Sequence, residues 1–330
     1  MTTRAVRFAA PRRIEVVEVD VPEPRAGEVV VRTEYSGISG GTELLAYRGE
    51  LDPEMPVDET LGSVEGTFRY PFAYGYACAG RVIRPAEGLP EGAAVFAFHP
   101  HQSLLVAPAS DVVRLEGVAA RIATLFPLVE TAFQVSLDAG PVHEEPVVVL
   151  GMGPVGLLSA LLMGRAGARV LAGEPREWRR KVAAGLGLTA VPPEELPDVV
   201  AGETGGRGVP LVVEASGAPD ALASALPLLA HEGTALVASW YGTKQVALPM
   251  GGAFHRRRLS IRSTQVSTIP AALAQRWTVP RRRAAARDLL DDLPLEAVAT
   301  HEFPLDRASE AFAALDRGEP GLLHAALRYT

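Results

Sequence analysis

The chain has 330 residues, a length that favours two domains over one core. Its 48% hydrophobic and 22% charged residues are typical of a globular protein and exclude a disordered or collagen-like chain. The net charge of −7 creates no general attraction for polyanions, so we expect neither nucleic acid nor an anionic membrane as a partner.

The single cysteine, Cys78, excludes an internal disulfide framework and a zinc site built from a cysteine cluster. Residues 1–20 alternate apolar and charged side chains and lack the apolar centre of a signal peptide. The longest apolar stretch, at 155–163, is too short to span a bilayer. These features predict a cytoplasmic protein.

Residues 6–113 predict a β-rich domain. Short apolar runs separated by glycine and proline recur at 14–19, 28–33, 80–83, 93–98 and 103–106. This spacing is typical of short strands joined by turns, as in a small barrel. Residues 121–139 lose the alternation and predict a connecting helix.

From residue 147 onward, predicted strands alternate with predicted helices. The strands are at 147–150, 169–172, 211–214, 234–238 and 260–264, and the helices at 154–166, 177–186 and 219–230. Such alternation implies right-handed crossovers and a parallel sheet. Segments at 284–290, 308–315 and 323–329 break the rhythm and are expected to rejoin the first domain.

We therefore predict an α/β protein in which one domain is inserted into another. The predicted boundaries are a substrate domain at 1–117, a dinucleotide-binding domain at 118–265, and a return segment at 266–330 that completes the first domain.

A glycine-rich turn between a buried strand and a helix predicts a dinucleotide site. In the run G-x-G-x-x-G, Gly151 permits a tight turn, Gly153 lets the backbone approach a pyrophosphate, and Gly156 allows close packing of helix on strand. Pro154 and Val155 open the helix, whose first N–H groups face the phosphates. An ordinary turn of an α/β domain is the alternative interpretation.

Glu174 follows the second strand of this domain, where an acidic side chain accepts hydrogen bonds from the adenosine ribose and repels a 2′-phosphate. It therefore favours NAD as the cofactor. NADP stays the alternative, because a 2′-phosphate could be bound by the arginines that follow, Arg176, Arg179 and Arg180.

Ser216 and Ser239 follow the fourth and fifth strands of the same domain. The carboxyl ends of the strands line the ligand crevice of a doubly wound sheet. Both serines are therefore expected to contact the cofactor.

The chain resembles the medium-chain dehydrogenase/reductase family over nearly its full length. The similarity lies in YSGISGGTE at 35–43, PFAYGYA at 71–77, the glycine run, VEASG at 213–217 and the ending 301–329. It implies a GroES-like β-barrel substrate domain joined to a doubly wound Rossmann domain. The first motif, with RGE at 48–50, is similar to the zinc-less branch of bacteriochlorophyllide dehydrogenase-like members, which are thought to oxidise a hydroxyethyl to an acetyl group.

The resemblance also implies that no zinc is bound. Zinc-containing members have a cysteine and a Gly-His-Glu motif where this chain has Ser39 and, in the second motif, Tyr76 and Ala77. A third ligand would fall near Pro127, whose side chain cannot bind metal. A catalytic zinc needs about three protein ligands, so we expect no metal.

A metal-free enzyme needs another group to take the proton of an alcohol. His99 and His101 lie in the segment FHPHQS and are the first candidates for a general base. Both could instead be loop histidines without a catalytic role.

Tyr76 replaces a zinc ligand, so that its phenol either donates to the substrate oxygen or fills the former metal cavity. Thr42 matches the hydroxyl that relays a proton in the family, and Ser39 could assist it, although either could merely cap a turn. Glu130, in the connecting helix, is expected to orient a histidine or bind a polar substrate, or else to lie on the helix surface.

The first hypothesis is a zinc-independent oxidoreductase acting on a secondary alcohol or ketone of a fairly large or polar molecule. The second is an NADPH-dependent enone or quinone reductase, and the third a dinucleotide-binding protein without catalysis. A small-molecule substrate and a homodimer or homotetramer are expected.

Overall fold

The computed structural model describes residues 2–63 and 65–329, so Met1, Val64 and Thr330 lie outside the described residues. The chain divides into two compact units, Met1–Pro127 with Arg283–Thr330 (unit 1) and Leu128–Arg282 (unit 2). The boundaries fall inside two helices, α3 (Phe126–Ala139) and α8 (Val279–Asp292). One unit is inserted into the other, and both boundaries lie later than 117/118 and 265/266.

The later boundaries follow from contacts that sequence patterns do not show. Helix α2 (Ala120–Ala123) packs on strands of unit 1, although it was expected to belong to the inserted domain. Residues 266–282 belong to unit 2, and the Arg282 side chain binds α3 at Glu130. Tertiary contacts therefore decide to which unit each connecting segment belongs.

Unit 1 is predominantly antiparallel. A hairpin is formed by β1 (Thr2–Ala10) and β2 (Arg13–Asp20). A larger sheet has the order β14 (His301–Pro304), β15 (Ala325–Arg328), β3 (Glu28–Ile38), β4 (Cys78–Arg84), β5 (Ala94–Ala97) and β7 (Val112–Arg114), with β6 (Leu104–Pro108) paired to β3. Because β15 pairs with β3, the end of the chain completes the first sheet.

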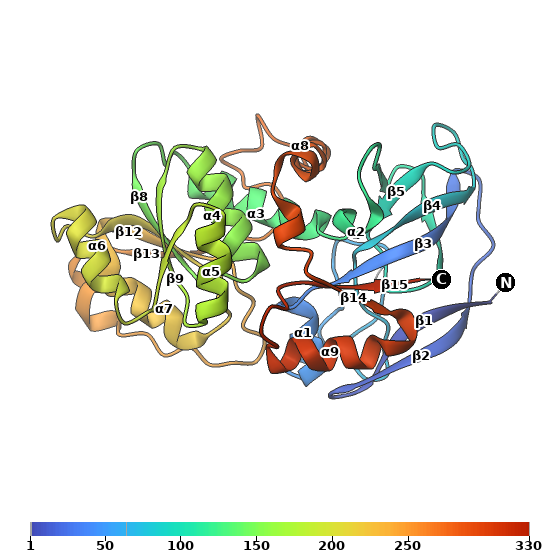
Figure 1. Ribbon diagram of the computed structural model, residues 1–330, viewed down its shortest axis with the longest axis horizontal. Helices are drawn as coiled ribbons and strands as arrows, with labels where there is room; N and C mark the ends of the chain where they lie inside the picture. The colour runs from blue at the N-terminus through green and yellow to red at the C-terminus, as the bar shows by residue number, and fades with distance from the viewer. Residues whose placement is uncertain (1, 64, 330) are drawn as a thin grey trace. The chain divides into compact units, whose positions relative to one another are not determined.

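Two helices of unit 1 cover its aromatic core. These are α1 (Thr42–Arg48) and α9 (Ala308–Arg317), and α9 lies beside β2 (Figure 1). Phe8 stacks on Phe72 with ring centroids 5.2 Å apart and meets the edge of Phe312 at 5.3 Å. The core therefore joins the first strand to the last helix. Short 3-10 turns are at Leu295–Ala297 and Leu305–Arg307.

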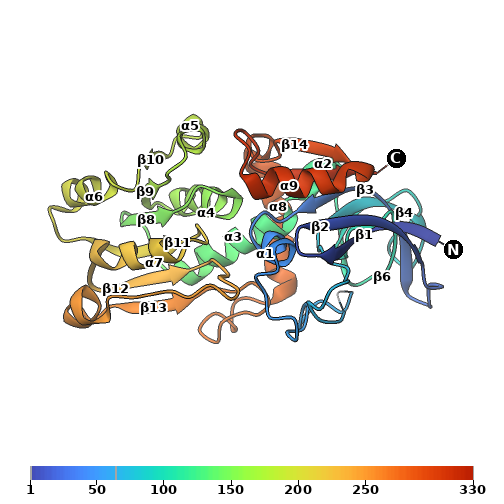
Figure 2. The ribbon, with the colours of Figure 1, turned by 90° about the horizontal axis from the view of Figure 1, so that it is seen from below.

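Unit 2 has a six-stranded parallel sheet with the order β10-β9-β8-β11-β12-β13 (Figure 2). The strands are β8 (Pro146–Leu150), β9 (Arg169–Gly173), β10 (Thr189–Val191), β11 (Val209–Glu214), β12 (Leu229–Val237) and β13 (Ser260–Ser263). The helices are α4 (Pro154–Arg165), α5 (Glu177–Gly185), α6 (Leu196–Thr204) and α7 (Pro219–Ala225), with a π-helical turn at Met250–Phe254. The order of strands is that of a doubly wound Rossmann domain.

Two details of unit 2 differ from the sequence prediction. The helix predicted at 219–230 ends at Ala225, a 3-10 turn follows at Leu226–Leu228, and strand β12 begins at Leu229. Pro227 explains the break, because proline lacks an N–H and clashes with the preceding turn of an α-helix. Strand β10 and helix α6 were not predicted, since β10 has only three residues.

Among residues 2–63 and 65–329, no helix is both long enough and apolar enough to cross a membrane.

Candidate functional site

Three hydroxyl side chains gather at one end of the β3–β4 pair in unit 1, and we call them the hydroxyl site: Ser39, Thr42 and Tyr76. Ser39 follows β3, Thr42 opens α1, and Tyr76 precedes β4. Ser36 lies opposite Cys78 in the antiparallel register, which brings Ser39 and Tyr76 to the same end. The three hydroxyls were proposed separately from sequence, and the structure groups them.

Tyr76 is a hydrogen-bond donor over the whole neutral pH range. Burial, and after it the charge of Glu43, raise the pKa of its phenol to about 12, against hydrogen bonds with Ser39 and Thr42 that lower it. A phenol with this pKa stays protonated near pH 7. It can polarise a carbonyl oxygen but is a poor base in its resting state.

A fully buried glutamate lies beneath the hydroxyl site. Glu43 has 0% exposure; its Oε1 accepts the Ser39 N–H at 2.8 Å, and its Oε2 lies 2.8 Å from His101 Nε2. The Glu43 N–H donates in return to the Ser39 carbonyl at 3.1 Å. These bonds fix the turn that carries Ser39 and Thr42.

His101 is enclosed rather than exposed to a ligand. Its exposure is 0%, and its second ring nitrogen, Nδ1, lies 2.8 Å from Ser36 Oγ. The ring packs against Gly75, whose φ is +110° and where a Cβ would lie 2.5 Å from the imidazole. Strand β1 holds the backbone through a hydrogen bond from Val6 N–H to the His101 carbonyl at 2.9 Å.

Ser36 continues the chain of hydrogen bonds toward the end of the protein. Its Oγ lies 2.8 Å from the hydroxyl of Tyr329, which is half-buried. Four side chains from four separate segments are thus linked in the order Tyr329, Ser36, His101 and Glu43. We call these four residues the buried chain.

His99 differs from His101 in its free ring nitrogen. Its Nδ1 lies 2.9 Å from the carbonyl of Pro100, which assigns the ring proton to Nδ1 and leaves Nε2 as an acceptor. No described residue binds Nε2. Burial lowers the pKa of His99, so the half-buried ring is neutral near pH 7. It can therefore accept a proton.

The residues around the hydroxyl site do not fit zinc. Zinc prefers thiolate, imidazole and carboxylate ligands, whereas Ser39, Thr42 and Tyr76 are neutral hydroxyls. His101 and Glu43 bind each other. The Cys78 thiol donates to the carbonyls of His99 and Pro100, and burial raises the pKa of this thiol to about 12. Within the described ranges, no three His, Cys, Asp or Glu side chains form a metal cluster.

The glycine-rich turn of unit 2 has the form that a dinucleotide requires. Gly151 has φ +92°, and a Cβ there would lie 2.7 Å from Ser216 Cα; a Cβ at Gly156 would lie 1.9 Å from the Gly151 carbonyl oxygen. At Gly153 the nearest atom is Arg179 Nη1, 3.8 Å away. The turn is closed on its inner side and open at Gly153, where a pyrophosphate can approach α4. Pro154 begins α4, and Val155 follows it.

Glu174 lies directly after β9 and beside this turn. Its Oε2 accepts the Met152 N–H at 2.7 Å, and its Oε1 accepts the Arg176 N–H at 2.9 Å. Arg179 Nη1 lies 3.7 Å from Oε2. Each carboxylate oxygen can accept a second bond, so the side chain is able to bind a ribose hydroxyl as well. Arg180 instead donates to the Glu174 and Pro175 carbonyls.

Ser216 and Ser239 belong to a network around the buried Glu214 at the end of β11. Glu214 Oε1 accepts from the Ser216 N–H at 2.7 Å, and Oε2 accepts from the Tyr241 hydroxyl at 2.6 Å. Ser239 Oγ accepts the Gly217 N–H at 2.8 Å. These bonds shape the loops after β11 and β12, at the carboxyl edge of the sheet.

Glu130 is an ion-pair partner inside unit 2. Its Oε1 accepts from Arg282 Nη2 at 3.0 Å and from Nε at 3.1 Å, and the two side chains are 3% and 1% exposed. Arg282 also donates to Gln134 Oε1 at 2.7 Å and to the Val266 carbonyl. The helix-surface alternative for Glu130 is therefore wrong, and the structure gives it a partner that sequence reasoning missed.

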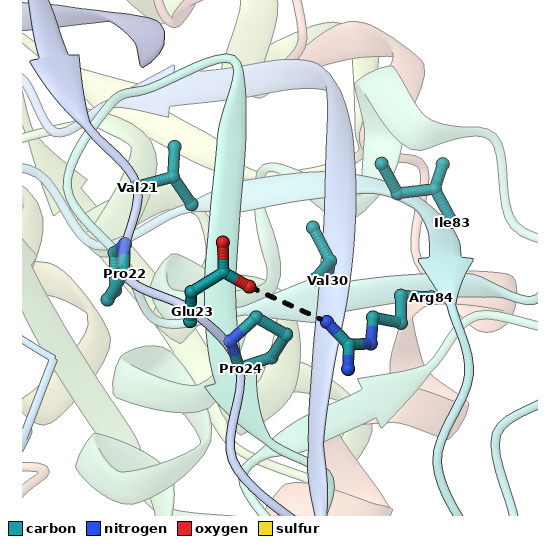
Figure 3. A pocket seen from close by; sticks show the side chains of 7 residues that line it. All are labelled: Val21, Pro22, Glu23, Pro24, Val30, Ile83 and Arg84. Carbon is teal, nitrogen blue, oxygen red and sulfur yellow. Dashed lines mark ion pairs between the residues drawn. The ribbon is translucent and has the colours of Figure 1, made fainter. Parts of the chain in front are cut away.

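A surface hollow in unit 1 has no part in these networks. It is lined by residues from the β2–β3 connection, β3 and β4: Val21, Pro22, Glu23, Pro24, Val30, Ile83 and Arg84 (Figure 3). Glu23 and Arg84 are 3.9 Å apart and mostly exposed, and such pairs contribute little stability. The hollow shares no residue with either candidate site.

Sequence reasoning missed the residues that hold the sites in place. Glu43 stands in the motif at 35–43, and its place directly before the apolar run LLAY of α1 is the one local feature that could have drawn attention to it. Ser36, Tyr329 and Arg282 carry no comparable signal, because their partners lie 293 and 152 positions away in the chain.

Comparisons with known proteins identify dehydrogenases with the same fold. A family model described as zinc-binding dehydrogenase matches residues 154–278. The chain is 30% identical to 2-desacetyl-2-hydroxyethyl bacteriochlorophyllide A dehydrogenase from Cereibacter sphaeroides, over 95% of this chain and 94% of the relative. It is 26% identical to L-threonine 3-dehydrogenase from Pyrococcus abyssi, over 93% of each. The structure of 2R,3R-butanediol dehydrogenase from Bacillus subtilis has a TM-score of 0.80 at 20% identity and covers 99% of each chain.

The buried Arg282–Glu130 pair leads to a prediction about stability. We expect Arg282→Met to lower the free energy of unfolding by about 3–5 kcal/mol, because it removes the cation that faces a buried carboxylate. Urea denaturation measures the change. Arg256→Met, at an exposed arginine of the same unit, is the control. The double variant Arg282→Met, Glu130→Leu should recover most of the loss, and a single variant as stable as wild type would contradict the account.

Proposed function

The chain belongs to the medium-chain dehydrogenase/reductase family, whose members are NAD(P)-dependent oxidoreductases, and we propose that it transfers a hydride without zinc between NAD and a secondary alcohol or ketone. The observation that carries the proposal is the hydroxyl site. Neutral hydroxyls stand together over a buried carboxylate, and they can bind a substrate oxygen by hydrogen bonds alone.

In ketone reduction, the Tyr76 phenol donates a hydrogen bond to the carbonyl oxygen, and a protonated Nε2 of His99 supplies the proton of the new alcohol. Thr42 and Ser39 hold the phenol in place by hydrogen bonds. In alcohol oxidation, the hydroxyl proton passes to Nε2 of neutral His99 while the carbinol carbon loses a hydride. When bound, the nicotinamide accepts or returns that hydride.

The cofactor is proposed to lie on the turn of Gly151, Gly153 and Gly156, with Pro154 and Val155 at the start of α4. Glu174 would accept the adenosine ribose hydroxyls, and the Ser216 and Ser239 loops would border the cofactor at the carboxyl edge of the sheet.

The substrate is proposed to be a fairly large or polar small molecule. The name of the Cereibacter relative specifies a hydroxyethyl bacteriochlorophyllide, which supports a large substrate with a secondary alcohol. A cytoplasmic location and a homodimer or homotetramer are proposed with it. The edge strand β13 pairs with β12 on one side, so it offers an edge for a second copy.

A second candidate is an NADPH-dependent enone or quinone reductase. It is favoured by Arg179, whose guanidinium lies between Glu174 and the open side of Gly153 and suits a 2′-phosphate. Rapid-mixing measurements of hydride transfer with alcohols, ketones and quinones distinguish the two. Tight cofactor binding without turnover of any of these would support the non-catalytic alternative.

Glu174 provides the test of cofactor choice. We expect Glu174→Gln to weaken NAD binding about tenfold or more, because a charged hydrogen-bond acceptor contributes about 1.5–3 kcal/mol. NADP binding should weaken less, since the charge that repels the 2′-phosphate is gone. Fluorescence titration of both cofactors measures the effect, with the exposed Glu177→Gln as the matched control. If the wild-type protein prefers NADP, Arg179 and not Glu174 determines the choice of cofactor.

Zinc independence is tested by metal analysis. We expect the purified protein to contain no stoichiometric zinc and to keep its turnover rate after treatment with a chelator, because its hydroxyl donors do not suit zinc. One zinc per chain, with activity lost on chelation and regained on adding zinc, would refute this part of the proposal.

The two histidines are expected to respond differently to the same substitution. His99→Gln should lower the turnover rate by about 10²–10⁴-fold in both directions, with cofactor affinity unchanged. His101→Gln should lower the melting temperature, because it breaks the bond to buried Glu43, and should lower the turnover rate much less than His99→Gln does. Near-normal turnover of His99→Gln across the pH range would exclude it as the base, and Tyr76→Phe then decides whether the hydroxyl site takes part.

A further inference from the structure

The hydrogen bonds of the buried chain run in one direction and end at Glu43, which binds the backbone of Ser39 in the hydroxyl site. An ionised Glu43 can only accept hydrogen bonds, so His101 Nε2 must carry a proton. With a neutral ring, Nδ1 accepts from Ser36, and Ser36 in turn accepts from Tyr329. Every donor then points toward Glu43.

The carboxylate at the end of this chain acts on all three hydroxyls. Glu43 follows Thr42 directly and binds the backbone N–H of Ser39 at 2.8 Å, so it fixes the positions of both. Its charge is the second largest cause, after burial, of the raised pKa of Tyr76. One residue therefore fixes the geometry of the hydroxyl site and contributes to the raised pKa of Tyr76.

Stability alone does not account for such an arrangement. Removing a carboxylate and an imidazole from water costs several kcal/mol per charged group, and well-packed apolar side chains in their place are often as stable or more stable. Unit 1 already has an apolar core of aromatic rings around Phe8, Phe72 and Phe312, and the His101 ring meets the edge of Phe312 at 6.3 Å. A polar chain inside this core indicates a role beyond packing.

We propose that Glu43, His101, Ser36 and Tyr329 are positioning residues that hold the hydroxyl site in register and keep Tyr76 as a neutral hydrogen-bond donor. The inference rests on the proposed function, since it assigns the donor its role toward the substrate oxygen. None of the four touches the substrate in this proposal. They act through Ser39, Thr42 and Tyr76.

Other titratable groups also face this region and are part of its electrostatics. Asp58 and Tyr74 act on Tyr76, with the Tyr74 and Tyr76 ring centroids 6.0 Å apart. The remaining groups that interact with Glu43, His101 or Tyr329 are Cys78 and His99. The charge of Glu43 raises the pKa of Tyr76 more than the charge of Asp58 does, so substituting Glu43 should have the larger effect.

The decisive variant is Glu43→Gln, compared with Glu43→Asp, which retains the negative charge. Loss of the charge stabilises the phenolate, so the pKa of Tyr76 should fall below its value of about 12. The alkaline limb of the pH–kcat profile for ketone reduction should move to lower pH, with the KM for the cofactor unchanged. Glu43→Asp should keep the alkaline limb of wild type, even if the shorter side chain lowers kcat.

A spectroscopic titration makes the result independent of the substrate. The ultraviolet absorbance of tyrosinate is titrated in each protein and in its Tyr76→Phe counterpart, and the difference isolates Tyr76. If the protein turned over no alcohol or ketone, this titration would still test Glu43, so failure of the proposed function is distinguishable. An unchanged Tyr76 titration in Glu43→Gln, with only a lower melting temperature, would assign the chain a purely structural role.

Tyr329→Phe tests the end of the buried chain opposite Glu43. It replaces Glu43→Gln as the test if that variant does not fold. It removes one hydroxyl and retains the buried carboxylate. Loss of a neutral hydrogen bond is expected to lower kcat about two- to tenfold at an unchanged cofactor KM. Tyr35→Phe, at a phenol bonded to exposed Glu302, is the matched control. Equal kcat in Tyr329→Phe and wild type would overturn the proposal.

Discussion

The turns that form both candidate sites depend on three buried carboxylates, whose oxygens accept hydrogen bonds from backbone N–H groups. Glu43 takes the N–H of Ser39, Glu174 takes those of Met152 and Arg176, and Glu214 takes that of Ser216. A buried carboxylate is costly unless its lone pairs are occupied. Each one therefore dictates the path of the turn beside it, and these turns carry the candidate catalytic and cofactor-binding residues.

The two units use this device for different purposes. In unit 2 the carboxylates stand at the ends of β9 and β11, where they shape the loops of the candidate dinucleotide site and leave Gly153 open. In unit 1 Glu43 is paired with His101 and enclosed completely, so it can act only through its neighbours. In the proposed function, Glu174 meets the cofactor, whereas Glu43 organises the residues that meet the substrate.

In the proposed function, the hydroxyl site binds the substrate oxygen by hydrogen bonds in a relative of zinc-binding dehydrogenases. A metal polarises an oxygen by its charge, whereas a phenol does so by donating a hydrogen bond. Burial and a neighbouring negative charge keep Tyr76 in the donating form. The charge of Glu43 raises the pKa of Tyr76, and the hydrogen bonds from Ser39 and Thr42 lower it in part.

The sequence by itself determined the α/β class, the family, the inserted dinucleotide-binding domain and the glycine turn at 151–156, because these depend on local patterns along one segment. It also identified Ser39, Thr42 and Tyr76 through their places in motifs. Only the tertiary structure decided that these hydroxyls share one site, that His101 is enclosed while His99 keeps a ring nitrogen free, and that Glu130 is bound by Arg282. Burial and hydrogen-bond partners arise from residues far apart in the chain, so no local pattern contains them.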